Sequence, residues 1–89
     1  MVAVKGLVRG RVQGVGFRYF VKCHADIHRL SGYAKNRIDG RVEFLLQGDQ
    51  ADVDAVVAQI RQGPDYARVD EVSLNRAESV SEQKGFRTG

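Results

Sequence analysis

The chain has 89 residues, of which 43% are hydrophobic and 28% charged, and its formal net charge is +3. This length favours one domain over residues 1–89 and disfavours a large cavity for a bulky cofactor. The mild positive charge favours anionic partners, but it does not distinguish a nucleic acid from a small phosphate compound.

The first predicted element is a strand over residues 2–9, where apolar residues recur at every second position. The apolar stretch at the N-terminus, residues 1–4, stops at Lys5 and is too short for a signal peptide or a membrane span. We therefore expect a cytoplasmic protein with no membrane attachment.

A glycine-rich loop is predicted over residues 10–17, leading into the N-terminus of a helix. Glycines let loop amides converge on an anion, and the unpaired amides of a helix N-terminus favour one there. Arg18 stands at the edge of this loop, where a guanidinium can add a forked contact to a phosphate. The loop lacks the Gly-Lys-Ser/Thr ending of nucleotide-binding loops and the spacing of the dinucleotide fingerprint.

The helix is predicted over residues 17–30, and it has two competing apolar stripes at helical spacing. One stripe consists of Phe20, Cys23, Ile27 and Leu30, and the other of Phe17, Val21 and Ala25. Periodicity does not choose between them. Cys23 is the single cysteine, so no internal disulfide can form. His24 and His28 have the spacing of two metal ligands, but without a third ligand we predict no metal site.

A β-hairpin is predicted next, from strands over residues 32–38 and 41–48. Asp39-Gly40 separates the two strands and is a pair typical of tight hairpin turns. In the second strand, Val42 and Phe44 belong to an apolar set that alternates with polar residues. This alternation predicts one buried face.

A second helix is predicted after Asp49, which can act as its N-cap, with Asp52 in the first turn. Its apolar face consists of Val53, Val56, Val57 and Ile60. Gly63 and Pro64 are expected to end the helix.

A strand over residues 69–76 and a short closing strand around Phe86 complete the predicted elements. The order strand, helix, strand, strand, helix, strand predicts an α+β protein with two helices on one face of a four-stranded antiparallel sheet. This is the ferredoxin-like, or split βαβ, sandwich. Such a fold by itself does not indicate an activity.

Two motifs resemble the signatures of the acylphosphatase family. The first is Gly10-x-Val12-Gln13-Gly14-Val15-x-Phe17-Arg18. The second is Gly32-Tyr33-Ala34-Lys35-Asn36, three residues, Gly40-x-Val42, five residues and Gly48. The resemblance extends over nearly the whole chain, because the order of elements also matches.

The resemblance implies hydrolysis of the carboxyl-phosphate bond of small acyl phosphates to a carboxylate and inorganic phosphate. Arg18 carries over as the catalytic arginine and Asn36 as the catalytic residue that orients water. The phosphate-binding cradle that carries over is Gln13, Gly14, Val15, Gly16, Phe17 and Arg18. We expect a metal-independent enzyme, without a cofactor, that acts as a monomer.

His28 and Arg29 depart from the family's pattern, which has an apolar residue and a glycine at these positions. Arg29 therefore replaces a residue favoured in the left-handed conformation that ends many helices. This departure concerns the end of the first helix and not the predicted site.

A sheet that binds single-stranded RNA is the main alternative, because Tyr19, Tyr33 and Phe44 could stack on bases. Such a domain needs a basic and aromatic motif on a central strand, whereas residues 41–47 include an acidic residue and alternate like a core strand. We therefore expect no nucleic-acid partner. A noncatalytic domain that keeps the phosphate cradle is a second alternative.

Overall fold

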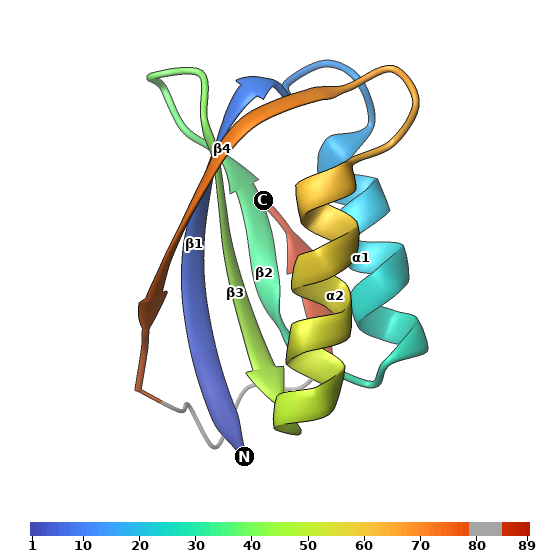
Figure 1. Cartoon of the computed structure of the whole chain (residues 1–89), viewed down its shortest axis with the longest axis vertical. Helices are drawn as coiled ribbons and strands as arrows, with labels where there is room; N and C mark the ends of the chain where they lie inside the picture. Colours follow the sequence, from blue (N-terminus) through green and yellow to red (C-terminus); the bar gives the residue numbers. More distant parts are fainter. Residues whose placement is uncertain (79–84) are drawn as a thin grey trace.

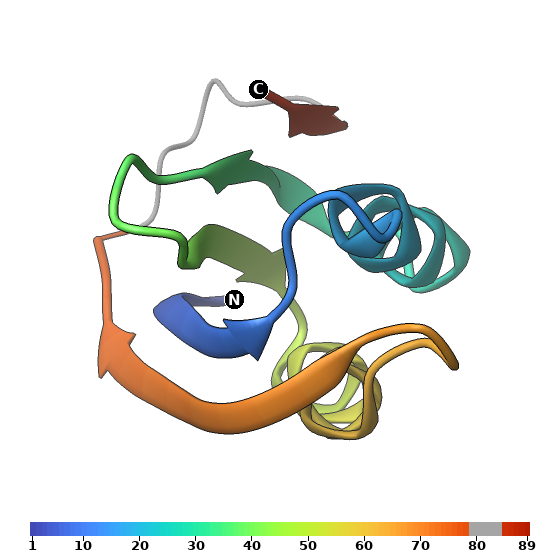
Figure 2. The same ribbon diagram turned by 90° about the horizontal axis from the view of Figure 1, so that it is seen from above.

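A computed structural model describes residues 1–78 and 85–89 of the chain (Figure 1). The elements are β1 (Val2–Arg11), α1 (Phe17–Ile27), β2 (Ser31–Asn36), β3 (Val42–Gly48), α2 (Gln50–Gln62), β4 (Arg68–Arg76) and β5 (Phe86–Thr88). Both helices cover the same face of the β-sheet (Figure 2). The predicted α+β, ferredoxin-like arrangement is confirmed.

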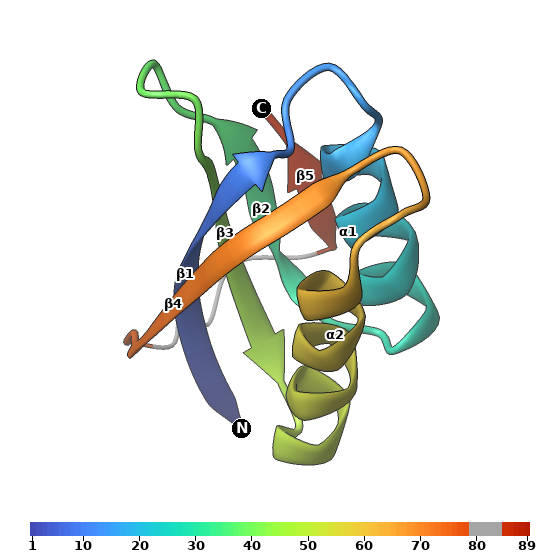
Figure 3. The same ribbon diagram turned by 45° about the horizontal axis from the view of Figure 1, so that its top comes forward.

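The sheet has five strands in the order β4-β1-β3-β2-β5 (Figure 3). The first four form the predicted antiparallel sheet, with β3 and β1 at its centre. The closing strand around Phe86 is present, but β5 pairs parallel to β2 and makes the sheet mixed. The C-terminal strand thus lies beside the strand that carries Asn36.

The buried face of α1 is the stripe Phe17, Val21 and Ala25. Ile27, in the competing stripe, is 73% exposed. The helix ends at Ile27 and not at Leu30 as predicted, because Arg29 adopts a left-handed φ of 58°. This turn redirects the chain into β2 and buries Leu30 beneath the sheet, so the helix ending differs from the periodicity-based prediction.

Helix α2 buries the predicted face, Val53, Val56, Val57 and Ile60, and stops at Gly63. Asp49 is the N-cap residue, but its side chain makes no capping hydrogen bond, so that part of the prediction is wrong. Asp52 lies in the first turn as predicted and pairs with His28, whose Nδ1 lies 2.8 Å from Asp52 Oδ1. This pair connects the end of α1 to the start of α2.

The central strand β3 carries a buried carboxylate on the sheet face away from the helices. Glu43 is only 6% exposed, and it accepts hydrogen bonds from the Tyr33 hydroxyl at 2.5 Å and from Arg37 Nη1 at 2.9 Å. Lys5 and Lys35 lie 3.8 and 3.7 Å from its Oε2. These partners, Tyr33 first, lower the pKa of Glu43 against the opposing effect of burial. Burial and the bond to Glu43 raise the pKa of Tyr33 to about 12.

We expect Glu43→Gln to lower the free energy of unfolding by about 1–2 kcal/mol at neutral pH, because charge-assisted hydrogen bonds are lost. A lowered folded-state pKa adds stability that is complete above the unfolded-state pKa and is lost as the pH falls through the folded-state value. The variant should therefore lose less stability than the wild type between about pH 5 and pH 3. Urea unfolding across this range measures the difference.

Glu71→Gln is the control, because Glu71 is a carboxylate whose side chain is 60% exposed and whose partner Arg9 lies 3.5 Å away. An exposed pair of this kind contributes little to stability. Equal acid sensitivity in the wild type and Glu43→Gln would contradict the role given to the buried carboxylate.

Candidate functional site

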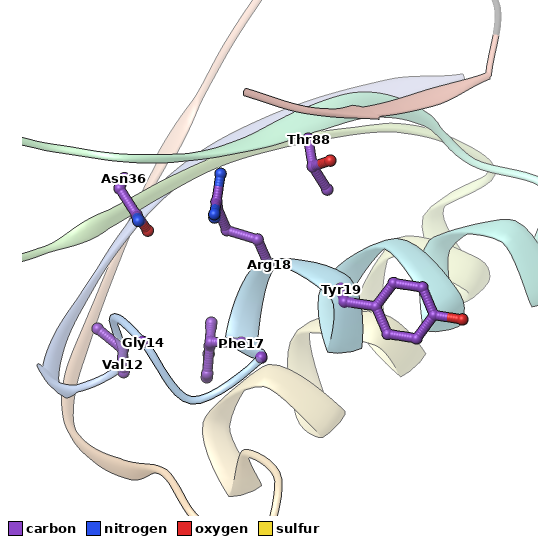
Figure 4. A pocket seen from close by; sticks show the side chains of 8 residues that line it. Val12, Gly14, Phe17, Arg18, Tyr19, Asn36 and Thr88 are labelled. Carbon is purple, nitrogen blue, oxygen red and sulfur yellow. The ribbon is translucent and has the colours of Figure 1, made fainter.

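A cavity of about 170 Å³ opens where the loop after β1, the first turn of α1, the end of β2 and β5 meet (Figure 4). Its lining residues are Val12, Gly14, Gly16, Phe17, Arg18, Tyr19, Asn36 and Thr88. Clefts for drug-sized ligands typically enclose about 300–1,000 Å³. This cavity has the scale of a small anion.

Arg18 and Asn36 come from different elements and face this cavity together (Figure 4). Arg18 belongs to the first turn of α1, and Asn36 is the last residue of β2. Four of the six predicted cradle residues line the cavity: Gly14, Gly16, Phe17 and Arg18. Gln13 and Val15 lie in the same loop but outside the lining.

The cradle loop depends on two left-handed glycines. Gly14 and Gly16 both have φ of 75°, a conformation that other residues rarely adopt. Gly16 is also the N-cap of α1, where no side chain caps the helix and the first turn contains no acidic residue. The amides at this N-terminus are therefore available to an anion in the cavity, and the helix dipole favours one.

The guanidinium of Arg18 is held across the cavity. Its Nη1 donates a hydrogen bond to the backbone oxygen of Gly89. The Gly89 amide in turn donates to the Ala34 oxygen at 2.9 Å, so this contact belongs to the β2–β5 edge. Thr88, the last residue of β5, lines the cavity beside it. The short β5 strand therefore contributes one wall of the site.

Gln13 has a structural role that sequence reasoning missed. Its Nε2 donates to the backbone oxygens of Arg37 at 2.8 Å and Arg41 at 3.0 Å. These partners lie 24 and 28 residues away, so no local pattern could reveal them. The side chain thus joins the cradle loop to the connection that follows Asn36.

That hairpin connection, residues 37–41, is longer than the predicted tight turn. The hairpin closes through Arg37 N–H to the Arg41 oxygen at 2.8 Å, and Gly40 N–H bonds the Arg37 oxygen at 3.2 Å. The central turn residues are therefore Ile38 and Asp39, one position earlier than Asp39-Gly40. Sequence pairs indicate that a turn is present better than they indicate its register.

Charge pairs rigidify the same hairpin connection. Asp39 Oδ2 accepts from Arg41 Nη2 at 2.7 Å and from Arg37 Nε at 3.3 Å, while its Oδ1 accepts from the Arg41 amide at 3.1 Å. The hydrogen bonds from Arg41 hold the pKa of Asp39 well below its usual range. Both arginines are thereby paired with carboxylates, and Arg18 is the cation that lines the cavity.

Within residues 1–78 and 85–89, no three His, Cys, Asp or Glu side chains are grouped so that they could hold a metal ion. In the same part of the chain, no helix is long and apolar enough to cross a bilayer. His24 makes an edge contact with the ring of Phe20, and His28 pairs with Asp52, so the two histidines have separate surroundings.

Comparison with known proteins identifies one family. A sequence model described as "Acylphosphatase" matches residues 4–88. A curated acylphosphatase from Bacillus subtilis strain 168 is 40% identical over 86 residues, covering 97% of this chain and 94% of that protein. The crystal structure of acylphosphatase from Bacillus subtilis has a TM-score of 0.95 at 38% identity, covering 100% of this chain and 99% of that chain.

A similar fold also occurs inside a much larger protein. The crystal structure of full-length HypF, solved in a phosphate- and nucleotide-bound form, matches with a TM-score of 0.84 and 27% identity. The match covers 100% of this chain but 12% of HypF. The fold therefore occurs both in proteins of similar length to this chain and as part of a larger one.

We expect Gln13→Ala to lower the free energy of unfolding by about 1 kcal/mol, because two hydrogen bonds to the hairpin connection are lost. Amide hydrogen exchange at residues 37–41 should also become faster, because the connection opens more readily. Gln50→Ala is the control, since the Gln50 side chain bonds the exposed Asp54 at 2.8 Å, on another part of the surface. Unchanged exchange in Gln13→Ala would show that the bond does not hold the connection.

Proposed function

The chain belongs to the acylphosphatase family, and we propose that it hydrolyses the carboxyl-phosphate bond of small acyl phosphates, releasing a carboxylate and inorganic phosphate. The observation that carries this proposal is the shared cavity of Arg18, Asn36 and the glycine cradle (Figure 4). A positive side chain and a polar amide thus face a space of the size of a phosphate group.

The phosphoryl group is bound by the backbone amides of the cradle and by Arg18. In the proposed complex, the guanidinium exchanges its contact with the Gly89 oxygen for the phosphoryl oxygens. A planar guanidinium can hold two of these oxygens at once. Because the amides and the guanidinium are fixed before the reaction, they stabilise the charge that redistributes over the phosphoryl oxygens.

Asn36 orients the attacking water. Its amide oxygen accepts a hydrogen bond from the water and directs the water oxygen to phosphorus. A water–phosphorus bond forms, the bond between phosphorus and the carboxyl oxygen breaks, and the carboxylate leaves with the electron pair. The described cavity lining contains no Asp, Glu or His. The proton therefore passes to a phosphate oxygen of the substrate.

The proposed enzyme works without a metal or a cofactor. A carboxylate is a good leaving group, so the reaction requires neither a strong nucleophile nor a Lewis acid. Arg18 and the cradle amides supply the positive charge that magnesium and lysine supply at other phosphoryl-transfer sites. The same site accounts for phosphate as a product, which the cradle can bind and release.

The RNA-binding alternative requires aromatic residues on one exposed face. Phe44 is fully buried on the helix side of the sheet. Tyr33 lies on the opposite face with its hydroxyl bonded to Glu43, and Tyr19 belongs to α1. The three aromatic rings therefore do not form a common stacking surface.

We expect Arg18→Ala and Asn36→Ala each to lower kcat for benzoyl phosphate by roughly 10²-fold or more, because each removes a group aligned on the reacting phosphorus. The assay contains excess chelator, and wild-type turnover should persist in it. Arg61→Ala is the matched control, since Arg61 is an exposed arginine in the last turn of α2. Full activity in a folded Arg18→Ala variant, or none in the wild type, would refute the proposal.

Hydrolysis in ¹⁸O-labelled water tests where the water attacks. Attack on phosphorus should place the label in inorganic phosphate and leave the carboxylate unlabelled. Mass spectrometry of both products after a single turnover measures this. Label in the carboxylate would mean attack on the carbonyl carbon and would contradict the role given to Asn36.

A further inference from the structure

The two ends of the cavity are lined by different side chains, a polar amide at one end and a tyrosine ring with a threonine at the other. In an in-line displacement, the attacking water and the leaving group lie on opposite sides of phosphorus. Asn36 lies at one side of the Arg18 guanidinium, and Thr88 and Tyr19 lie at the other (Figure 4). If Asn36 holds the water, the acyl group must extend past Tyr19 and Thr88.

We propose that Tyr19 contacts the acyl group and gives the enzyme a preference for acyl phosphates with a flat, apolar or aromatic acyl group. This inference rests on the proposed function, since it takes its direction from the water held by Asn36. Tyr19 lines the cavity and is nevertheless 69% exposed, so its ring is open to a ligand at the rim.

The ring of Tyr19 lies uncovered at the surface of α1. The pKa of Tyr19 is raised, chiefly by Cys23, which lies one helical turn further along α1. In Figure 4 the ring extends along α1, away from the Arg18 guanidinium. An aromatic side chain has only two side-chain torsions to order when a ligand stacks on it, so the loss of conformational entropy is small.

The charges near Tyr19 favour an uncharged acyl group. Lys22 and Asp26 follow Tyr19 on α1, and they form an ion pair with each other at 2.7 Å. Lys22 therefore has an anionic partner already. On the opposite wall, Thr88 offers a hydroxyl and a methyl group and no charge. A second anion on the acyl group would thus meet no free cation from these residues, whereas an aromatic acyl group would meet a ring.

The test compares kcat/KM for benzoyl phosphate and acetyl phosphate in the wild type, Tyr19→Ala and Tyr19→Phe. Stacking of one partly exposed aromatic pair corresponds to about two- to tenfold in affinity. We expect the benzoyl-to-acetyl ratio to fall by this factor in Tyr19→Ala and to be retained in Tyr19→Phe, which keeps the ring. The change should appear mainly in KM, because the acyl body binds away from phosphorus.

Tyr66→Ala is the matched control. Tyr66 is an 84% exposed tyrosine in the loop after α2, outside the cavity lining, and its loss should leave the ratio unchanged. Tyr19→Ser provides the same comparison should Tyr19→Ala fail to fold.

The inference is overturned if the ratio is the same in the wild type and in the folded Tyr19→Ala or Tyr19→Ser variant. An equal fall of the benzoyl-to-acetyl ratio in Tyr66→Ala would also overturn it, because the effect would then not be local to the cavity. The full fall of the ratio in Tyr19→Phe would overturn it as well, because the preference would then depend on the hydroxyl and not on the ring. If the wild type hydrolyses neither compound, the proposed function fails. Hydrolysis of both with an unchanged ratio refutes the role of Tyr19 alone.

Discussion

The site depends on the pairing of β1 and β2 with the two sides of the central strand β3, in a register that meets at Val42. Val42, at the start of β3, lies opposite Val8 of β1 and opposite Asn36 of β2. The cradle loop begins where β1 ends, so one register places both this loop and Asn36 at the same end of the sheet. A slip of one residue would turn Asn36 to the other face. The buried centre of the sheet therefore sets the spacing of the site.

Glu43, the residue after Val42, supports the site from the other face of the sheet. Glu43 binds Arg37 from the face away from the helices, and Arg37 begins the connection that Gln13 holds through its backbone oxygen. The carboxylate, the hairpin connection and the cradle loop are thus consecutive parts of one hydrogen-bonded chain. Under the proposed function, Arg18 and Asn36 require such support at the ends of their elements, because a displacement of about 1 Å is enough to weaken catalysis.

The proposed chemistry suits a fold of this size. An 89-residue chain can build only a small core, and its cavity of about 170 Å³ has room for a phosphoryl group and little more. Under the proposed function, recognition inside the cavity would be limited to the phosphoryl group that all acyl phosphates share. In this proposal, discrimination among acyl groups falls to the rim, where Tyr19 is exposed.

The sequence by itself determined the features that arise from local signals. The cradle loop, Arg18 at the helix start, the buried face of α2 and its end at Gly63 follow from glycine conformation and helical periodicity. Tertiary structure decided the rest. It chose the stripe of α1 that is buried, ended that helix at Ile27, placed β5 parallel to β2 and gave Gln13 its partners across the site. These features depend on contacts between residues far apart in the chain, and local propensity contains no information about them.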